Sequence, residues 1–276
     1  MEGKFSQLAQ EKPYIIRLTE NDRIAKSGDV MELMSCLTRS QGKQLIIGGH
    51  RGHQSDIREN TIRNFSQVIG KVPYIEIDVQ LTKDDQLVIF HDSRLEWTTE
   101  LYGEIRDYTL AELRESFEID TVIDTIAWCS KNQLGVAFEL KIPGSYSIES
   151  RRLLAQKLCQ YIKLYDFYSE CFVFGKDYDT LGLIREIDEL INIGIIAPPK
   201  KDDVIPLMKK IGSFMYLDFL KDISKNLIKE LHDAGYLVDG SVVNSEDEIR
   251  KAVQLGVDMI ESDYPEIMIE LYETIK

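Results

Sequence analysis

The sequence predicts an α/β protein built as a (β/α)8 barrel, and three observations lead to this fold class. The chain has 276 residues, of which 43% are hydrophobic, which is enough for a large core. From residue 44 onward, short apolar runs alternate with amphipathic helical stretches, as expected for parallel strands joined by right-handed crossovers. Residues 44–276 suit eight such units in a closed barrel, for which about 250 residues is typical.

Each strand of this barrel is expected at an apolar run that is too short for a helix and is bounded by turn residues. The eight runs lie at 45–48, 74–79, 134–140, 171–174, 191–197, 213–217, 236–243 and 257–261. Helical patterns separate them near 61–70, 109–116, 147–165, 178–189, 201–211, 222–234 and 245–255. An open doubly wound sheet is the alternative, but no Gly-x-Gly-x-x-Gly follows the first strand.

The segment after the second strand breaks the alternation. Residues 79–90 resemble a strand, a turn and a second strand, and the turn at 83–86 is too short for a crossover helix. The second strand should therefore return antiparallel, as a β-hairpin. A turn centred on Asp84 and Asp85 places His91 opposite Asp78, to within about one residue.

Residues 1–43 differ from the rest of the chain, because they are polar and carry only one weak helical pattern. We expect them to form an N-terminal helical extension, and residues 44–276 to form the barrel domain. The sequence leaves the role of this extension and the oligomeric state open.

The overall charge excludes several kinds of partner. With 33 Lys and Arg against 47 Asp and Glu, the net charge is -14, so binding to nucleic acid is not expected. No apolar run approaches the roughly 20 residues of a membrane span, and the N-terminus lacks an apolar signal-peptide core. The four cysteines have no C-x-x-C spacing. These features favour a cytoplasmic protein that acts on a small molecule.

Chemistry in such a barrel belongs to the carboxyl ends of the strands. The first strand ends in a Gly-Gly-His-Arg-Gly sequence, which places the imidazole of His50 beside the guanidinium of Arg51. An imidazole titrates near neutral pH, and a guanidinium matches the geometry of phosphate. The alternative, a solvated loop with no chemical role, stays open on these two residues alone.

The second strand carries Glu76 and Asp78, whose i, i+2 spacing points both carboxylates to one side. Two carboxylates within an apolar strand are costly unless a positive charge lies between them, and a divalent ion with oxygen ligands meets that need. Glu139 and Lys141 repeat the spacing on the next strand. They form either an ion pair or a third metal ligand beside a cationic phosphate contact. The hairpin brings His91 close to this group, and two histidines near a phosphate can act as general acid and base.

Together these residues resemble the glycerophosphodiester phosphodiesterase family. The resemblance extends from residue 45 to about residue 267, and the ordered set of motifs is specific where each alone is weak. The motifs are Gly49-His50-Arg51-Gly52, Glu59-Asn60-Thr61, Glu76-Ile77-Asp78-Val79, Thr82-Lys83-Asp84, His91-Asp92, Trp97-Thr98-Thr99, 107–113, Glu139-Leu140-Lys141, Val243-Asn244 and 255–265.

The resemblance implies a barrel phosphodiesterase that needs one divalent ion, Mg²⁺ or Ca²⁺. It implies that Glu76, Asp78 and Glu139 hold the metal, that His50 and His91 are the acid and base, and that Arg51 and Lys141 contact the phosphate. In the family, the glycerol 2-hydroxyl is thought to attack phosphorus and expel the alcohol, giving a cyclic phosphate that water then opens.

The chain departs from the family pattern at three places, and the two that replace aromatic residues concern the pocket for the substrate alcohol. The chain has Arg58 where the family usually has proline, Gly175-Lys176 where a Ser-Phe pair is frequent, and Ser241-Val242-Val243-Asn244 in place of Trp-Thr-Val-Asn. Fewer aromatic residues predict a more polar pocket, suited to a sugar or another polyol. Two further reactions stay open: synthesis of a sugar phosphodiester of the agrocinopine type, and a lyase reaction that stops at the cyclic phosphate. A non-enzymatic barrel is the remaining alternative.

Overall fold

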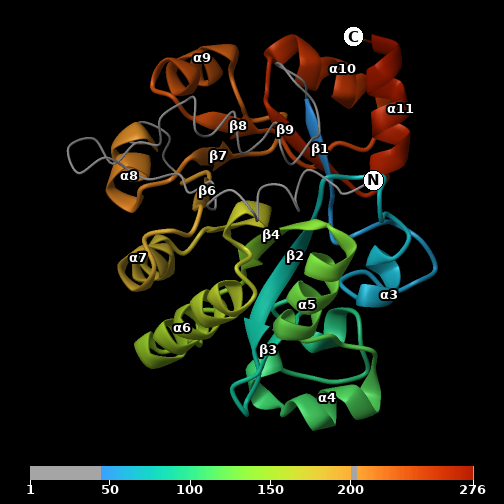
Figure 1. Cartoon of the computed structure of the whole chain (residues 1–276), viewed down its shortest axis with the longest axis vertical. Helices are drawn as coiled ribbons and strands as arrows, with labels where there is room; N and C mark the ends of the chain where they lie inside the picture. Colours follow the sequence, from blue (N-terminus) through green and yellow to red (C-terminus); the bar gives the residue numbers. More distant parts are fainter. Residues whose placement is uncertain (1–44, 200–203, 276) are drawn as a thin grey trace.

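The computed structural model describes residues 45–199 and 204–275, in which eight parallel strands form a barrel surrounded by helices (Figure 1). The strands lie in the order β5-β4-β2-β1-β9-β8-β7-β6, and a bridge between Val173 and Ile193 brings the two ends together. The predicted (β/α)8 fold is therefore confirmed. The barrel strands are β1 (Ile46–Gly49), β2 (Tyr74–Leu81), β4 (Gly135–Leu140), β5 (Cys171–Gly175), β6 (Gly194–Ile196), β7 (Met215–Leu217), β8 (Leu237–Asp239) and β9 (Met259–Ser262).

Helices lie at each predicted stretch, although several are shorter than expected. They are α3 (Ile62–Phe65), α4 (Leu110–Ser116), α6 (Ile148–Leu164), α7 (Tyr178–Ile187), α8 (Val204–Ile211), α9 (Lys225–Asp233) and α10 (Glu246–Leu255). Residues 201–203 of the predicted 201–211 stretch lie outside the described residues. Ser245 caps α10 as its spacing to Glu248 suggests, since its hydroxyl accepts a hydrogen bond from the Glu248 N–H.

The sequence analysis missed two helices, α5 (Val122–Asn132) and α11 (Pro265–Ile275). Helix α5 begins with a run of β-branched residues, which have low helix propensity. Its apolar face is nevertheless buried, and the Thr121 hydroxyl caps its first turn. Packing thus decides the conformation of this segment. Pro265 at the first position of α11 was an available signal, because proline is favoured there.

The predicted hairpin is confirmed, with a register one residue away from the expected one. Strand β3 (Leu87–Ile89) pairs antiparallel with β2, and Val79 lies opposite Ile89. The Phe90 N–H donates to the Asp78 carbonyl at 2.9 Å, so Phe90 rather than His91 faces Asp78. The chain then forms two short 3-10 helices, η1 (Leu95–Trp97) and η2 (Ile105–Asp107), before α4. This segment has its own small core, formed by Val88, Phe90, Leu95, Ile105, Leu113 and Ile119.

The barrel interior changes from apolar to polar along the strands, and this change positions the site. A buried cluster fills the amino-terminal part of the barrel and includes Ile46, Tyr74, Ala137, Phe172, Leu237 and Met259. Side chains in a strand return to the same face every second residue, so polar residues stand at the next inward positions. These are His50, Glu76, Asp78, Glu139, Lys141, Asp239, Glu261 and Asp263.

Three further predictions concern the N-terminal extension, the cysteines and the lack of a membrane span. The predicted helical extension 1–43 lies outside the described residues. Cys129, Cys159 and Cys171 are buried free thiols. Within the described part of the chain, no helix is both long and apolar enough to cross a membrane.

Candidate active site

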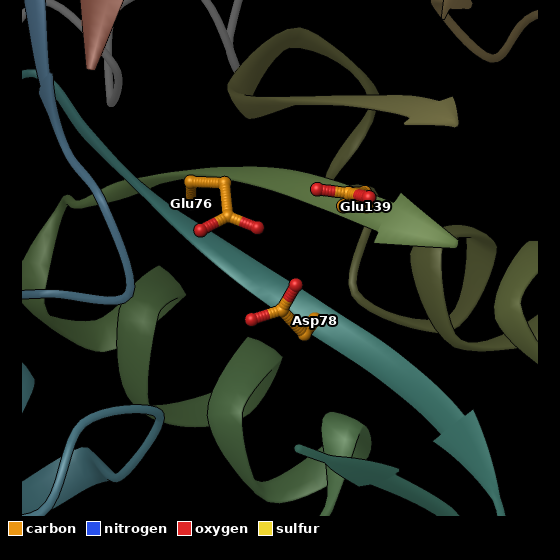
Figure 2. A group of neighbouring side chains, drawn as sticks. All are labelled: Glu76, Asp78 and Glu139. Carbon is orange, nitrogen blue, oxygen red and sulfur yellow. The ribbon is translucent and has the colours of Figure 1, made fainter. Parts of the chain in front are cut away.

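The acidic side chains of β2 and β4 meet inside the barrel near the carboxyl ends of the strands. The two strands pair in parallel with Asp78 opposite Glu139. Glu76 and Asp78 point to the same side of β2, as their spacing predicted, toward Glu139 on the neighbouring strand (Figure 2). Ile75 and Ile77, which flank Glu76 in the strand, belong to the large apolar cluster that also contains buried helix residues. The two carboxylates of β2 therefore face the barrel interior and not the solvent.

The three carboxylates are close enough to share one ion. Each offers an oxygen, and these oxygens all lie within 4.8 Å of one another. Glu76 is 1% exposed and Asp78 is 0% exposed. Glu76 Oε1 is buried and has no hydrogen-bond partner among the described residues. A buried, unpartnered carboxylate oxygen in an oxygen-rich cluster fits a hard divalent cation, for which the group supplies the preferred ligand type.

Two cationic side chains lie against the same carboxylates. Lys141 Nζ is 3.0 Å from Asp78 Oδ1 and 2.6 Å from Glu139 Oε1. Arg51 Nε is 3.5 Å from Asp78 Oδ2 on the other side. The Arg51 backbone N–H also donates to Glu76 Oε2 at 3.1 Å. Arg51 and Lys141 therefore both lie against the acidic cluster, and Lys141 forms the ion pair with Glu139 that the sequence left open.

Burial and the neighbouring charges shift the pKa values of the two β2 carboxyls in opposite directions. Burial raises the pKa of Glu76 well above its usual range, and the negative charges of Asp78 and Glu139 raise it further. Burial also acts to raise the pKa of Asp78, but Lys141 and Arg51 outweigh it and hold that pKa below its usual range. Without a bound cation, the cluster therefore favours a protonated Glu76 beside an ionised Asp78.

The loop after β1 holds Arg51 in place. Arg51 has a positive φ of 51°, and its Nη1 lies 3.0 Å from Glu59 Oε1. Asn60, which also has a positive φ of 55°, donates from Nδ2 to Asp78 Oδ2 at 2.7 Å. The Asp78 N–H donates in return to Asn60 Oδ1 at 3.3 Å. The loop and the Asp78 carboxylate thus fix one another.

Each of the two candidate histidines has an aspartate at Nδ1. His50 Nδ1 lies 2.6 Å from Asp263 Oδ1, just beyond β9, and Asn244 Nδ2 donates to the other Asp263 oxygen at 2.6 Å. His91 Nδ1 lies 2.8 Å from Asp92 Oδ1. An aspartate at Nδ1 fixes the orientation of an imidazole and leaves Nε2 to exchange protons.

A hollow of about 270 Å³ brings the predicted reactive residues together. His50, Arg51, His91, Glu139 and Lys141 all line it. Its far side is less polar than the sequence suggested, because it includes Phe174 and the 56% exposed Phe219. Lys176 also lines the hollow, as does Ser241. The Ser241 hydroxyl is already engaged, since it donates to the Asp239 carboxylate and accepts from the Glu261 N–H at 2.7 Å.

Two further buried carboxyls lie in the barrel interior, which the sequence analysis did not anticipate. Asp239 is 0% exposed and Glu261 is 3% exposed. Burial raises the pKa of Asp239 to about 7. Burial, together with the negative charges of Asp239 and Glu76, raises the pKa of Glu261 well above its usual range. Both carboxyls therefore keep their protons to a higher pH than an exposed carboxyl does.

The sequence analysis also assigned no role to Asp92, Asp263 and Asn60, which orient the histidines and Asp78. A signal for Asp263 was present, because it follows the last strand directly, at the same edge of the barrel as His50. The pairing itself joins residues 213 positions apart.

The chain matches the model of a known protein family over most of its length. The model of the glycerophosphoryl diester phosphodiesterase family matches residues 50–267, which include all seven candidate site residues. The chain belongs to this family. It is therefore an enzyme of the phosphoric diester hydrolase class, as the resemblance predicted.

Proteins similar to this chain support the assignment, and they match it over most of their length. A glycerophosphodiester phosphodiesterase of Bacillus altitudinis is 27% identical over 83% of this chain and 99% of its own. One from Caldanaerobacter subterraneus is 26% identical over 83% and 98%. Among solved structures, a Silicibacter pomeroyi protein matches 89% of this chain and 98% of its own with a TM-score of 0.79 and 19% identity. An Oleispira antarctica phosphodiesterase, solved in complex with the product sn-glycerol-3-phosphate, matches 83% and 96% with a TM-score of 0.73 and 22% identity.

Proposed function

We propose that this chain hydrolyses small soluble glycerophosphodiesters to glycerol phosphate and an alcohol, with one divalent ion, Mg²⁺ or Ca²⁺. Membership of the family supports the reaction, and relatives that span the same length carry that activity in their names. The Oleispira antarctica structure with bound sn-glycerol-3-phosphate supports the identity of the product.

One observation carries the proposal: both histidines, both phosphate-binding cations and a carboxylate of the acidic triad line the same hollow. A volume of about 270 Å³ suits a small diester. In this assignment Glu76, Asp78 and Glu139 hold the metal ion. The bound ion would supply positive charge that stabilises the negative charge gathering on the phosphoryl oxygens.

The side chains of the site can move every proton that the reaction needs. One imidazole of the His50 and His91 pair accepts the proton of the glycerol 2-hydroxyl as its oxygen bonds to phosphorus. The bond from phosphorus to the second alcohol breaks, and the other imidazole donates a proton to the departing oxygen. Arg51 and Lys141 contact the phosphate throughout. Water then opens the cyclic phosphate with the two imidazoles in exchanged roles, which restores their starting protonation.

Location and partners follow from the same proposal. A small diester needs neither a nucleic-acid partner nor a membrane span, and the net charge of -14 disfavours binding to phosphate backbones. We therefore place the protein in the cytoplasm, with a small-molecule phosphodiester as its partner.

Phosphorus NMR of the purified full chain with glycerophosphocholine tests the proposal. We expect glycerol phosphate to appear with Mg²⁺ or Ca²⁺ and not with EDTA. A cyclic phosphate that persists would make the protein a lyase, and a rate that rises with added polyol, giving a new diester, would indicate synthesis. His50→Ala and His91→Ala should each abolish turnover while keeping the melting temperature. Full turnover in either variant would contradict the two-histidine mechanism.

A further inference from the structure

A second hollow of about 380 Å³ adjoins the proposed catalytic centre. It lies between the loop after β1 and the segment after β3, and residues 53–60 form much of its wall. Arg51 and His91 line both this hollow and the one that contains His50 and Lys141. A diester with its phosphate at Arg51 can therefore extend one arm into each hollow.

Arg58 is a cation in this second hollow whose charge is not matched by an ion pair. Its guanidinium carbon lies 4.6 Å from the centre of the Phe117 ring and 5.4 Å from that of Phe90. Within residues 45–199 and 204–275, its guanidinium has neither a hydrogen bond nor a carboxylate at ion-pair distance. Burial lowers the pKa of Arg58 below its usual range, which shows that neighbouring acids do not compensate for lost hydration.

The acids whose charges act on Arg58 are bound to other groups. Glu59 pairs with Arg51 at 3.0 Å, and Glu118 pairs with Arg63 at 2.8 Å. Asp92 holds His91 at 2.8 Å and accepts from the Thr98 hydroxyl at 2.8 Å. Asp56 also lines the hollow, but it is exposed and is not among the groups that shift Arg58. The two aromatic rings offer the guanidinium no hydrogen-bond acceptor of the strength of a carboxylate, and its N–H donors remain available to an anion.

The loop that carries Arg58 is held rigidly. Asn64 is fully buried and donates from Nδ2 to the carbonyls of His53 at 2.8 Å and Ile57 at 2.9 Å. Its Oδ1 accepts from the His53 N–H at 2.9 Å. A stacked, fixed guanidinium loses little freedom when it binds an anion, so the site is organised before the ligand arrives.

From these contacts we propose that Arg58 binds an anionic group on the second alcohol of the diester. The substrate class is then a glycerophosphodiester whose leaving alcohol carries a carboxylate or a second phosphate, the two groups that a guanidinium binds through paired donors. This inference rests on the proposed function, because it places the scissile phosphate at Arg51. It replaces the polyol that the sequence departures suggested with an alcohol bearing a negative charge.

Two pairs of diesters that differ in one anionic group test the inference. The first pair is glycerophosphoserine and glycerophosphoethanolamine, which differ by a carboxylate. The second is glycerophosphoglycerol phosphate and glycerophosphoglycerol, which differ by a phosphate. We expect the anionic member of at least one pair to be cleaved with about 10-fold higher kcat/KM or more, the order expected for hydrogen bonds to a charged group. The pair with the larger ratio identifies the anion.

The variant Arg58→Met keeps an unbranched apolar side chain against the two rings and removes the charge. It should reduce the preference for the anionic member to about threefold or less, and Arg58→Lys should restore part of it. Arg63→Met is the matched control, because it removes the same charge nearby from a side chain that does not line the hollow. Arg63→Met should keep the wild-type ratio. A wild-type ratio near one for both pairs would overturn the inference, as would an unchanged ratio in Arg58→Met.

Calorimetric binding in EDTA separates this inference from the proposed function. The wild-type protein should bind the anionic member more tightly, and Arg58→Met should bind both members alike. Tighter binding without hydrolysis under any metal would contradict the proposed function and support the role of Arg58. Hydrolysis with equal affinities would support the function and overturn the role of Arg58.

Discussion

Asp263 and His50 lie 2.6 Å apart between Oδ1 and Nδ1, although 213 positions separate them in the chain. The contact forms because β1 and β9 are neighbours in the barrel, with Gly49 opposite Ser262. Asn244 holds the other Asp263 oxygen, so the aspartate is fixed on both sides. In the proposed mechanism, Asp263 is therefore a positioning residue that leaves Nε2 of His50 for the substrate.

Replacement of this carboxylate should slow catalysis without weakening substrate binding. In Asp263→Asn we expect kcat to fall about 10-fold or more, because an aspartate that fixes the tautomer of a catalytic histidine is worth at least that much. KM should change less than threefold. Steady-state kinetics on the diester identified by phosphorus NMR would measure both constants.

A third histidine–aspartate pair, besides those of His50 and His91, provides the control for this variant. His232 Nε2 lies 2.8 Å from Asp258 Oδ2 at the opposite end of the barrel strands from the site. Asp258→Asn makes the same chemical change and should keep kcat, even if the melting temperature drops. An equal loss of kcat in both variants would mean that Asp263 acts only through stability.

Metal binding should release protons and strengthen as the pH rises. Burial and the charges of Asp78 and Glu139 raise the pKa of Glu76 well above its usual range, whereas a metal ligand must be deprotonated. A higher pH removes that proton in advance, so the apparent affinity for Mg²⁺ or Ca²⁺ should increase from pH 6 to pH 8. Calorimetry in buffers of different ionisation enthalpy would count the protons released.

A variant of the acidic triad tests whether these carboxylates bind the ion. Glu139→Gln, at the least buried of the three positions, should weaken binding and reduce the rise in melting temperature caused by the ion. Glu246→Gln on the exposed face of α10 should behave as the wild type. Binding that is independent of pH and releases no proton would exclude Glu76 as a ligand.

The fold and the reactive residues could be predicted because their signals are local. Alternating apolar runs mark the strands, and the i, i+2 spacing of Glu76 and Asp78 fixes their shared face whatever surrounds them. The strand ends then lie at one edge of the barrel by topology alone. The hairpin register needed the exact turn geometry, and the partner expected for Asp78 was accordingly correct only to within the one-residue margin.

The remaining features depend on contacts between distant segments. Such contacts leave no local pattern in a single sequence. Helix α5 forms despite its β-branched start, because packing against the barrel outweighs its propensity. Arg58 looked like a substitution in a loop, and its meaning depends on Phe117, which follows a separate helix. The engagement of the Ser241 hydroxyl likewise depends on the neighbouring strand.

A partly buried glutamate far from the candidate site should make stability fall as the pH rises. Burial and then the charge of Asp166 raise the pKa of Glu170 from 4.5 to about 7. The unfolded chain loses this proton near the ordinary value, whereas the folded chain keeps it until about pH 7. The free energy of unfolding should therefore decrease between these two values and stay at the lower level above them.

Glu170→Gln removes this penalty. It should be more stable than the wild type by about 1 to 3 kcal/mol at pH 8 and nearly equal to it at pH 4.5. Urea unfolding at the two pH values measures the difference. Glu186→Gln, at an exposed position of α7, serves as the control and should change stability little at either pH. A gain of equal size at both pH values would show that Glu170 is not protonated in the folded protein.

Gly52 should be indispensable to the loop that carries Arg51. It has a φ of +99°, and an added Cβ would lie 2.2 Å from Asn64 Oδ1 and 2.8 Å from the Phe65 ring. Both neighbours are fully buried. Gly70 offers a matched comparison, because its φ is +72° but nothing lies within 4 Å of an added Cβ. Gly70→Ala thus reports backbone strain alone, whereas Gly52→Ala adds a steric clash.

We expect Gly70→Ala to cost about 1 kcal/mol of unfolding free energy and to keep full activity. Gly52→Ala should cost about 3 kcal/mol, because the clash with a packed core adds to the strain. It should also lower kcat/KM, since the Cβ displaces Asn64 and with it the loop that aligns Arg51. Chemical unfolding and kinetics on both variants provide the measurement. Equal stability losses would mean that the loop accommodates the methyl group, and intact kcat/KM in Gly52→Ala would show that the Arg51 loop aligns independently of Asn64.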